Sequence, residues 1–286
     1  MTAWKIIARD RTDMIGEGTY WSARENAVYW VDALGPAVNR LSLIDGQVAR
    51  WAMPEPLGWI IERERGGFIV GTRDGLARLD LDPFALEART HPDPGLPHHR
   101  MNDAKADAEG RIWFNTMDSS GEGDDGSLYR LDADGRWTRI DTGYCVPNGP
   151  ALSPCGRWLY HADTARSLIY RYARTDDGGV TDRQVFVRFS QADGVPDGMT
   201  TDAQGHLWVA HWGGGRISRF APDATLDRAI PLPARQITNI VFAGEHLDRM
   251  FVTSAAHELS APSDYDGALF EVDSGTRGAP THRYAG

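Results

Sequence analysis

A short apolar motif recurs six times along the chain, and this periodicity narrows the possible folds more than any other feature. The segments "AVYWVDA", "GFIVGTR", "RIWFNTM", "RWLYHAD", "HLWVAHW" and "RMFVTSA" align on Trp30, Ile69, Trp113, Leu159, Trp208 and Phe251, at intervals of 39 to 49 residues. A second series follows each of them and aligns on Arg40, Arg78, Arg130, Arg171, Arg219 and Glu271. Two independent series of six at this spacing predict a six-bladed β-propeller.

Each blade is expected to contain four antiparallel strands. The sequence holds 31 glycines in 286 residues and no window with a clean helical period, which favours an all-β protein. Segments upstream of the first series would form the innermost strands, and variable segments such as "RWTRID" would follow the second series as fourth strands. The segment "WKIIAR", residues 4–9, is expected to add an outer strand to the last blade and to close the ring of a single domain over residues 1–286. An eight-stranded barrel or two sandwiches would leave the two series unexplained.

The composition limits the class of partner. A chain of 286 residues that is 41% hydrophobic can build a large core. Its formal charge of −10, with no Lys/Arg cluster, argues against nucleic acid or an anionic membrane as a partner. It has neither a secretion signal nor an apolar run of about 18 residues, so we expect a soluble, cytoplasmic protein, either a monomer or a weak homo-oligomer. Cys145 and Cys155 are expected to be free buried thiols.

Polar residues of the innermost strands should converge on the channel. Counting back 11 to 13 residues from the first-series positions gives Glu17, Asn102, Asn148, Asp197 and Asn239. Glu17, Asn148 and Asp197 offer only oxygen ligands and a charge of −2, which suits a divalent cation such as Ca²⁺, Mg²⁺ or Mn²⁺. The tripeptides "PNG" and "PDG" are also common turns, but their equivalent registers favour one shared site.

Several motifs together carry a family resemblance. The segments "GEGTYW", "RMNDAKADAEGRIWFNTMD", "VPNGPALSPCGRWLYHAD" and "PDGMTTDAQGHLWVAHWGGGRISRF" resemble the gluconolactonase, senescence-marker-protein and luciferin-regenerating-enzyme family, most closely its bacterial xylonolactonase or arabinonolactonase type. The resemblance implies a six-bladed propeller with one divalent metal ion (Ca, Mg, Mn, Zn or Fe(II)) that hydrolyses a sugar lactone to the open aldonic acid. By motif, the metal ligands fall on Glu17, Asn148 and Asp197, and the substrate-binding residues fall on Arg100 and Asn102.

Roles within this site follow from ester chemistry. Asp197 is the candidate general base, with a water carried by the metal as the alternative source of the nucleophile. Arg100 would position the substrate, the alternative being an ion pair with an acidic neighbour. Asn102 would hold sugar hydroxyls, or else form a turn with Asp103. Because the chain lacks a Gly-x-Ser-x-Gly motif, metal-assisted hydrolysis fits better than a serine nucleophile.

Other residues and functions stay open from sequence alone. Trp59 or Trp212 could stack on a sugar, and His99, His161 and His211 are expected to be structural or rim residues, with His211 nearest a ligand. A broader lactone or phosphotriester hydrolase is one alternative function. A non-enzymatic metal-binding or interaction propeller is another, because propellers also serve as docking platforms.

Overall fold

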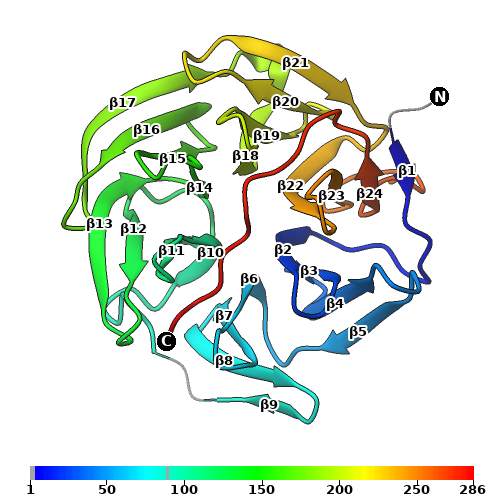
Figure 1. Cartoon of the computed structure of the whole chain (residues 1–286), viewed down its shortest axis with the longest axis horizontal. Coiled ribbons are helices and arrows are strands. Elements are labelled where there is room, and N and C mark those ends of the chain that lie inside the picture. The colour runs from blue at the N-terminus through cyan, green and yellow to red at the C-terminus, as the bar shows by residue number, and fades with distance from the viewer. Residues whose placement is uncertain (1–3, 88–89) are drawn as a thin grey trace.

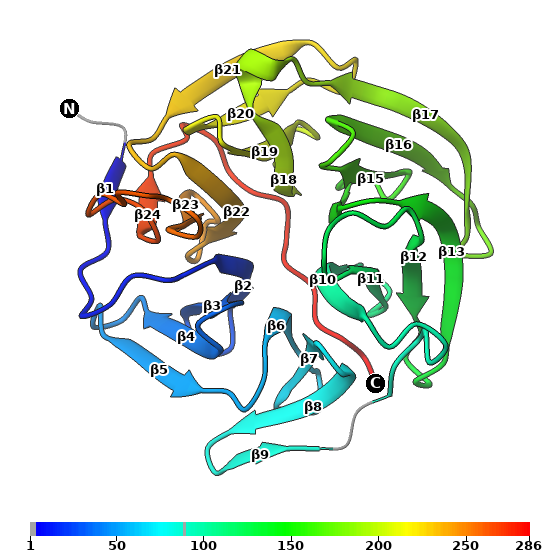
Figure 2. The ribbon, with the colours of Figure 1, turned by 180° about the vertical axis from the view of Figure 1, so that it is seen from behind.

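The computed structural model describes residues 4–87 and 90–286 and consists of six four-stranded antiparallel sheets arranged around a common axis (Figure 1). This confirms the predicted six-bladed β-propeller. The view from behind shows the same ring with β2, β6, β10, β14, β18 and β22 nearest the centre (Figure 2). Within the described residues, no helix has the length and apolar character needed to span a membrane.

Five blades use strands that are consecutive in the chain, from the axis outward. The first two blades contain β2 (Gly16–Ser22), β3 (Ala27–Asp32), β4 (Ala37–Ser42) and β5 (Val48–Ala52), then β6 (Leu57–Glu62), β7 (Phe68–Thr72), β8 (Gly75–Leu81) and β9 (Phe84–Leu86). The third and fourth contain β10 (His99–Ala106), β11 (Ile112–Asp118), β12 (Gly126–Leu131) and β13 (Trp137–Tyr144), then β14 (Pro147–Leu152), β15 (Trp158–Asp163), β16 (Leu168–Arg174) and β17 (Val180–Arg188). The fifth contains β18 (Val195–Thr201), β19 (Leu207–Trp212), β20 (Arg216–Phe220) and β21 (Leu226–Pro231), preceded by the 3₁₀ helix η1 (Gln191–Asp193).

The last blade departs from the predicted pattern. It contains β22 (Gln236–Ala243), β23 (Arg249–Ala255), β24 (Leu269–Val272) and β1 (Trp4–Ile6), and β1 pairs antiparallel with β24. We expected a fourth strand after each second-series strand and an extra one from the N-terminus. Instead, no strand follows β24 in the part of the chain that the structure describes, and β1 is itself the fourth strand.

The chain after β24 forms a strap, residues 273–286, that crosses the ring near its centre (Figures 1 and 2). Its backbone is tied to several blades, since Ala279 N–H donates to Thr201, Tyr284 N–H to Glu62 and Ala285 N–H to Gly110. The Tyr284 hydroxyl donates to the Asp132 carbonyl at 2.8 Å. The strap therefore joins elements that are distant in the sequence and covers one end of the channel.

The repeat anchors explain why the blades pack. All six first-series residues lie in second strands and are buried. Trp113 and Trp208 each donate an indole N–H to an aspartate in the preceding turn, Asp107 at 2.8 Å and Asp202 at 3.1 Å. These carboxylates also accept hydrogen bonds from backbone N–H groups of their own turns. Tryptophan at these positions therefore fills the blade interior without leaving a buried polar atom unpaired.

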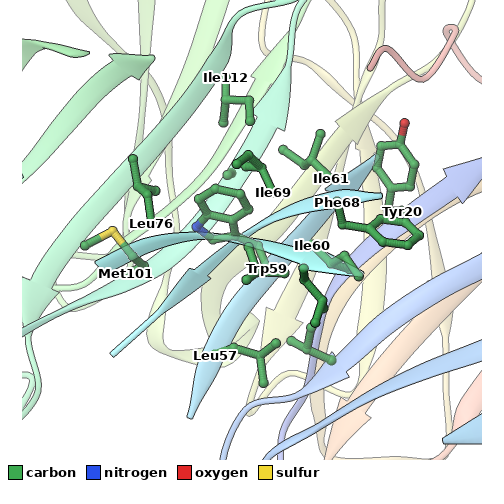
Figure 3. Close-up of a cluster of buried hydrophobic side chains, with 14 of the residues drawn as sticks. Tyr20, Leu57, Trp59, Ile60, Ile61, Phe68, Ile69, Leu76, Met101 and Ile112 are labelled. Carbon is green, nitrogen blue, oxygen red and sulfur yellow. The ribbon is translucent and has the colours of Figure 1, made fainter. Parts of the chain in front are cut away.

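Neighbouring blades share their cores. Figure 3 shows Trp59 and Ile61 of β6 lying among Tyr20 of the first blade and Met101 and Ile112 of the third. Full burial of each such side chain contributes about 1.5–3 kcal/mol. This packing fixes the relative position of the innermost strands, which the site described below depends on.

The two cysteines are both free thiols. Cys145 is buried as expected, whereas Cys155 is exposed. The expectation of two buried thiols was wrong for Cys155 because it lies in the solvent-facing turn between β14 and β15.

Candidate active site

Each innermost strand carries an irregularity in its pairing with the second strand. The register shifts fall between Glu17 and Tyr20, Leu57 and Trp59, Met101 and Ala104, Asn148 and Ala151, Pro196 and Met199, and Ile237 and Ile240. A bulge bends a strand and redirects its side chains. The five residues counted toward the axis from sequence therefore lie at or within five of these six bulges.

Two glycines allow the bulged strands to approach one another. Gly18 has a φ of +55°, and a Cβ atom there would lie 2.6 Å from the Gly58 carbonyl oxygen. A Cβ on Gly58 would in turn lie 2.2 Å from the Asn102 carbonyl oxygen. Only glycine fits such contacts, so the first three blades converge closely on one level of the channel.

A cavity of about 250 Å³ occupies this end of the channel. It is lined by all five predicted site residues, Glu17, Arg100, Asn102, Asn148 and Asp197, together with others that include Arg73, Thr164 and Trp212. A second cavity of about 190 Å³ lies at the opposite end, where Lys105, Thr201 and strap residues such as His282 line it. The predicted residues thus gather at the end away from the strap.

Two carboxylates, Glu17 and Asp197, line the cavity, and a third, Asp103, is buried beside them. Glu17 Oε2 accepts hydrogen bonds from Gly18 N–H at 2.9 Å and Asn239 Nδ2 at 2.8 Å. Asp103 is fully buried and accepts from Ala104 N–H at 2.7 Å and Gly149 N–H at 3.1 Å. Asp197 differs, because no side chain of the described residues donates a hydrogen bond to it.

Burial and mutual repulsion raise the pKa values of these groups. Burial and then the neighbouring Asp103 raise the pKa of Glu17 to about 8. Burial raises the pKa of Asp103 to about 6. Burial, Glu17 and Asp103 together raise the pKa of Asp197 well above its ordinary value. The protein alone therefore does not fully compensate this cluster of negative charge.

Guanidinium, amide and hydroxyl groups in the lining of the cavity form a hydrogen-bonded chain. Arg100 Nη1 donates to Asn102 Oδ1 at 2.6 Å, and Asn102 Nδ2 donates to Asn148 Oδ1 at 2.9 Å. Asn148 Nδ2 then donates to the Thr164 hydroxyl at 2.8 Å. These contacts turn the carbonyl oxygen of Asn148 toward the third blade and hold Arg100 beside the cavity.

The donor set can be tested for its fit to a divalent cation. The cavity is lined by two carboxylates and one amide oxygen, from Glu17, Asp197 and Asn148. The pKa values of both carboxylates are raised, and a bound cation would lower them again. Arg73 and Arg100 also line the cavity, and Lys105 lies on its far side in the lining of the second cavity. Burial lowers the pKa of Arg100 and of Lys105. Oxygen ligands with unbalanced negative charge are what a hard divalent ion requires, so the residues present fit such a group.

The structure also shows which alternatives for individual residues hold. The described residues contain no ion pair to Arg100, whose guanidinium bonds the Met101 carbonyl and Asn102. Asn102 lies within the bulge of β10 rather than in a turn. Asn115 stabilises this bulge, because its side-chain oxygen accepts a hydrogen bond from Asp103 N–H and its Nδ2 donates to the Gly149 carbonyl.

Sequence reasoning missed three contributors to the site. Asp103 was considered only as a turn partner, although it directly follows Asn102 inside the same bulge. Thr164 was not singled out, because its place next to Asn148 depends on the pairing of β14 with β15. Lys105, which is half-buried, donates to the Thr19 carbonyl at 3.4 Å and interacts electrostatically with Asp103 and Glu17.

The structure agrees with some of the expectations for the tryptophan and histidine residues and not with others. Trp212 lines the cavity, whereas Trp59 is fully buried in the shared core. His161 and His211 are buried, and His211 Nδ1 lies 2.7 Å from the Asp193 carbonyl oxygen. His211 does not line the cavity, so the expectation that it lies nearest a ligand is not supported. Burial lowers the pKa of His161 to about 3 and of His211 to about 4.

The structure is a β-propeller with buried carboxylate and amide oxygens gathered at one end of its channel. Residues 15–256 match the family described as the SMP-30/Gluconolactonase/LRE-like region. The chain belongs to this family, which confirms the resemblance seen in its motifs.

Individual relatives agree with this assignment over nearly the whole chain. The sequence is 36% identical to a 6-deoxy-6-sulfogluconolactonase from Pseudomonas putida, covering 93% of this chain and 91% of the relative. It is 32% identical to a pentonolactonase from Haloferax volcanii, covering 99% and 98%. The solved structure of a luciferin-regenerating enzyme superposes with a TM-score of 0.92 at 25% identity, covering 99% of each chain.

Proposed function

We propose that the protein hydrolyses a sugar lactone to the open aldonic acid, with a divalent metal ion held by Glu17, Asn148 and Asp197. The observation that carries the proposal is the convergence of these three residues with Arg100 and Asn102 on one small cavity. The names of the relatives support the substrate class, since they include a sulfogluconolactonase, a pentonolactonase and an L-arabinolactonase from Azospirillum brasilense.

The residues divide the chemistry between them. A bound divalent ion would act as a Lewis acid toward the lactone carbonyl. Arg100 donates from a guanidinium already oriented by Asn102, so it can bind a substrate oxygen and later the product carboxylate. Trp212 provides an apolar ring surface in the cavity against which a sugar face can pack.

Asp197 is the proposed general base. Its carboxylate lines the cavity and has no side-chain donor among the described residues, whereas Glu17 is held by Asn239. A carboxylate without such a donor can accept a proton from the attacking water as the new C–O bond forms. The ring C–O bond then breaks, and protonated Asp197 gives the proton to the leaving ring oxygen, which becomes a hydroxyl of the aldonic acid.

A substrate panel tests the proposal. Acid release at constant pH should be followed with xylono-, arabinono-, galactono- and gluconolactones, with aliphatic lactones and a phosphotriester as comparison substrates. We expect sugar lactones to be opened faster than the others. Equal rates on aliphatic lactones or phosphotriesters would assign a broader hydrolase, and no turnover of any compound would favour a non-enzymatic propeller.

A further inference from the structure

A second group of metal-ligand side chains lies at the start of β10, apart from the residues that line the cavity. One donor atom from each of His98, His99 and Asp125 lies within 4.8 Å of the others. His99 Nε2 lies 2.9 Å from Asp125 Oδ1, and His98 Nε2 lies 4.0 Å from Asp125 Oδ2. None of the three contributes to the oxygen-ligand set in the channel.

The spacing and chemistry of this group suit a transition metal. Ligand atoms at about 2.0–2.1 Å from a tetrahedral Zn²⁺ are separated from one another by about 3.3 Å. The separations of 2.9 Å from His99 Nε2 to Asp125 Oδ1 and 4.0 Å from His98 Nε2 to Asp125 Oδ2 lie on either side of that value. The first is a direct hydrogen bond, which a metal ion between the two atoms would replace. Two imidazoles and one carboxylate are ligands typical of Zn²⁺, whereas Ca²⁺ and Mg²⁺ take oxygen ligands.

A second buried carboxylate lies near the other ring nitrogen of His99. Its ring is fully buried, and its Nδ1, which lacks a hydrogen-bond partner, lies 3.5 Å from Asp93 Oδ2. Asp93 is itself buried and accepts hydrogen bonds from Thr116 Oγ1 and the Tyr129 hydroxyl. A carboxylate that accepts a hydrogen bond from the second ring nitrogen orients a metal-bound histidine, and Asp93 would take this role once it moved closer to Nδ1.

We propose that His98, His99 and Asp125 form a second metal site for a Zn²⁺-like ion at the rim of the propeller. The site would join the start of β10 to the end of the segment between β11 and β12, residues 119–125. A tetrahedral ion takes a fourth ligand, and Asp118 Oδ2, which lies 3.8 Å from His98 Nε2, is a nearby carboxylate oxygen for that position. The same segment contacts the wall of the candidate active site, because Gly121 lies against Val146. A metal ion here would anchor this segment next to the cavity.

Metal stoichiometry tests the proposal independently of any activity. Metal-stripped protein should be titrated with Zn²⁺ by calorimetry, in the wild type, in the channel variant Asp197→Asn, in the rim variant His98→Gln/Asp125→Asn and in the combined variant. Both rim residues are exposed, so these changes leave the core intact. The exposed His246→Gln serves as a matched histidine control.

We expect the rim variant to bind one Zn²⁺ fewer than the wild type and the combined variant to lack both sites. Replacing Zn²⁺ with Co²⁺ should give a visible spectrum with imidazole ligation that survives in Asp197→Asn and disappears in the rim variant. The proposal is overturned if the rim variant binds as many ions as the wild type, or if His246→Gln lowers the count equally.

Discussion

Asn102 on the third blade donates a 2.9 Å hydrogen bond to the side-chain oxygen of Asn148 on the fourth. The same Asn102 accepts a hydrogen bond from Arg100. One amide thus joins the proposed substrate-binding group to a proposed metal ligand, and neither can shift without disturbing the other.

Asn102→Ala should weaken both functions of this amide. We expect metal affinity to fall about 10-fold to 100-fold, as for other groups that orient a metal ligand, and KM for the lactone to rise because Arg100 loses its support. Thr164→Val is the matched comparison, since Thr164 contacts Asn148 but not Arg100. It should reduce metal affinity with a smaller change in KM at saturating metal. Equal KM effects in the two variants would contradict the assigned role of Asn102.

Glu17→Gln should have opposite effects on the metal-bound and the metal-free protein. Metal affinity should fall on the order of 100-fold or more, because one charged ligand is lost. The metal-free protein should gain roughly 1–3 kcal/mol of unfolding free energy at pH 7, because a buried carboxylate with a pKa of about 8 is replaced by a neutral amide. Urea unfolding with chelator present measures this gain, and a loss of stability there would argue against charge repulsion at the site.

His161 should make the protein sensitive to acid. Its pKa is about 3 in the folded state, against 6.5 ordinarily, because burial disfavours the charged ring. Between these values the unfolded chain binds a proton that the folded chain does not, so stability falls as pH decreases from about 6.5 toward 3. His161→Gln should reduce this slope by up to about 1.4 kcal/mol per pH unit. The slope of unfolding free energy against pH is the readout, and His246→Gln should leave it unchanged.

The strap should contribute to stability rather than to catalysis. Tyr284 is buried between the second and third blades, away from the lining of the candidate active site, and its hydroxyl donates to the Asp132 carbonyl. Tyr284→Phe should lower the free energy of unfolding by about 1 kcal/mol, and Tyr284→Ala should lower it by about 3 kcal/mol or more. Thermal unfolding and kcat should be measured together. A variant that keeps its stability but loses turnover would place the strap in the active site.

The sequence predicted the blade pattern because the repeat reflects a local requirement. Each second strand needs a large apolar residue, and Trp113 and Trp208 each have an aspartate six residues upstream to accept the indole N–H. The last blade could not be predicted in full, since the pairing of β1 with β24 joins the two ends of the chain. No local signal distinguishes that pairing from an additional fifth strand.

The sequence predicted which strand positions face the channel, but not the side-chain contacts made there. Counting residues from the anchors placed Glu17, Asn148 and Asp197 at one height, and the bulges explain why they line one cavity. The role of Asp103 depends on which way its side chain turns within the bulge, where it receives Gly149 N–H from the next blade. Contacts of that kind arise only when neighbouring blades are packed.

Metal-dependent opening of a sugar lactone is the most direct test of the central claim. Protein stripped with chelator should be assayed by acid release at constant pH, before and after adding single divalent metals, with spontaneous hydrolysis subtracted. Asp197→Asn should be compared with Asp45→Asn, a change at an exposed turn. We predict turnover only with metal restored, lost in Asp197→Asn and retained in Asp45→Asn. Full activity without metal, or in Asp197→Asn, would contradict the proposed site.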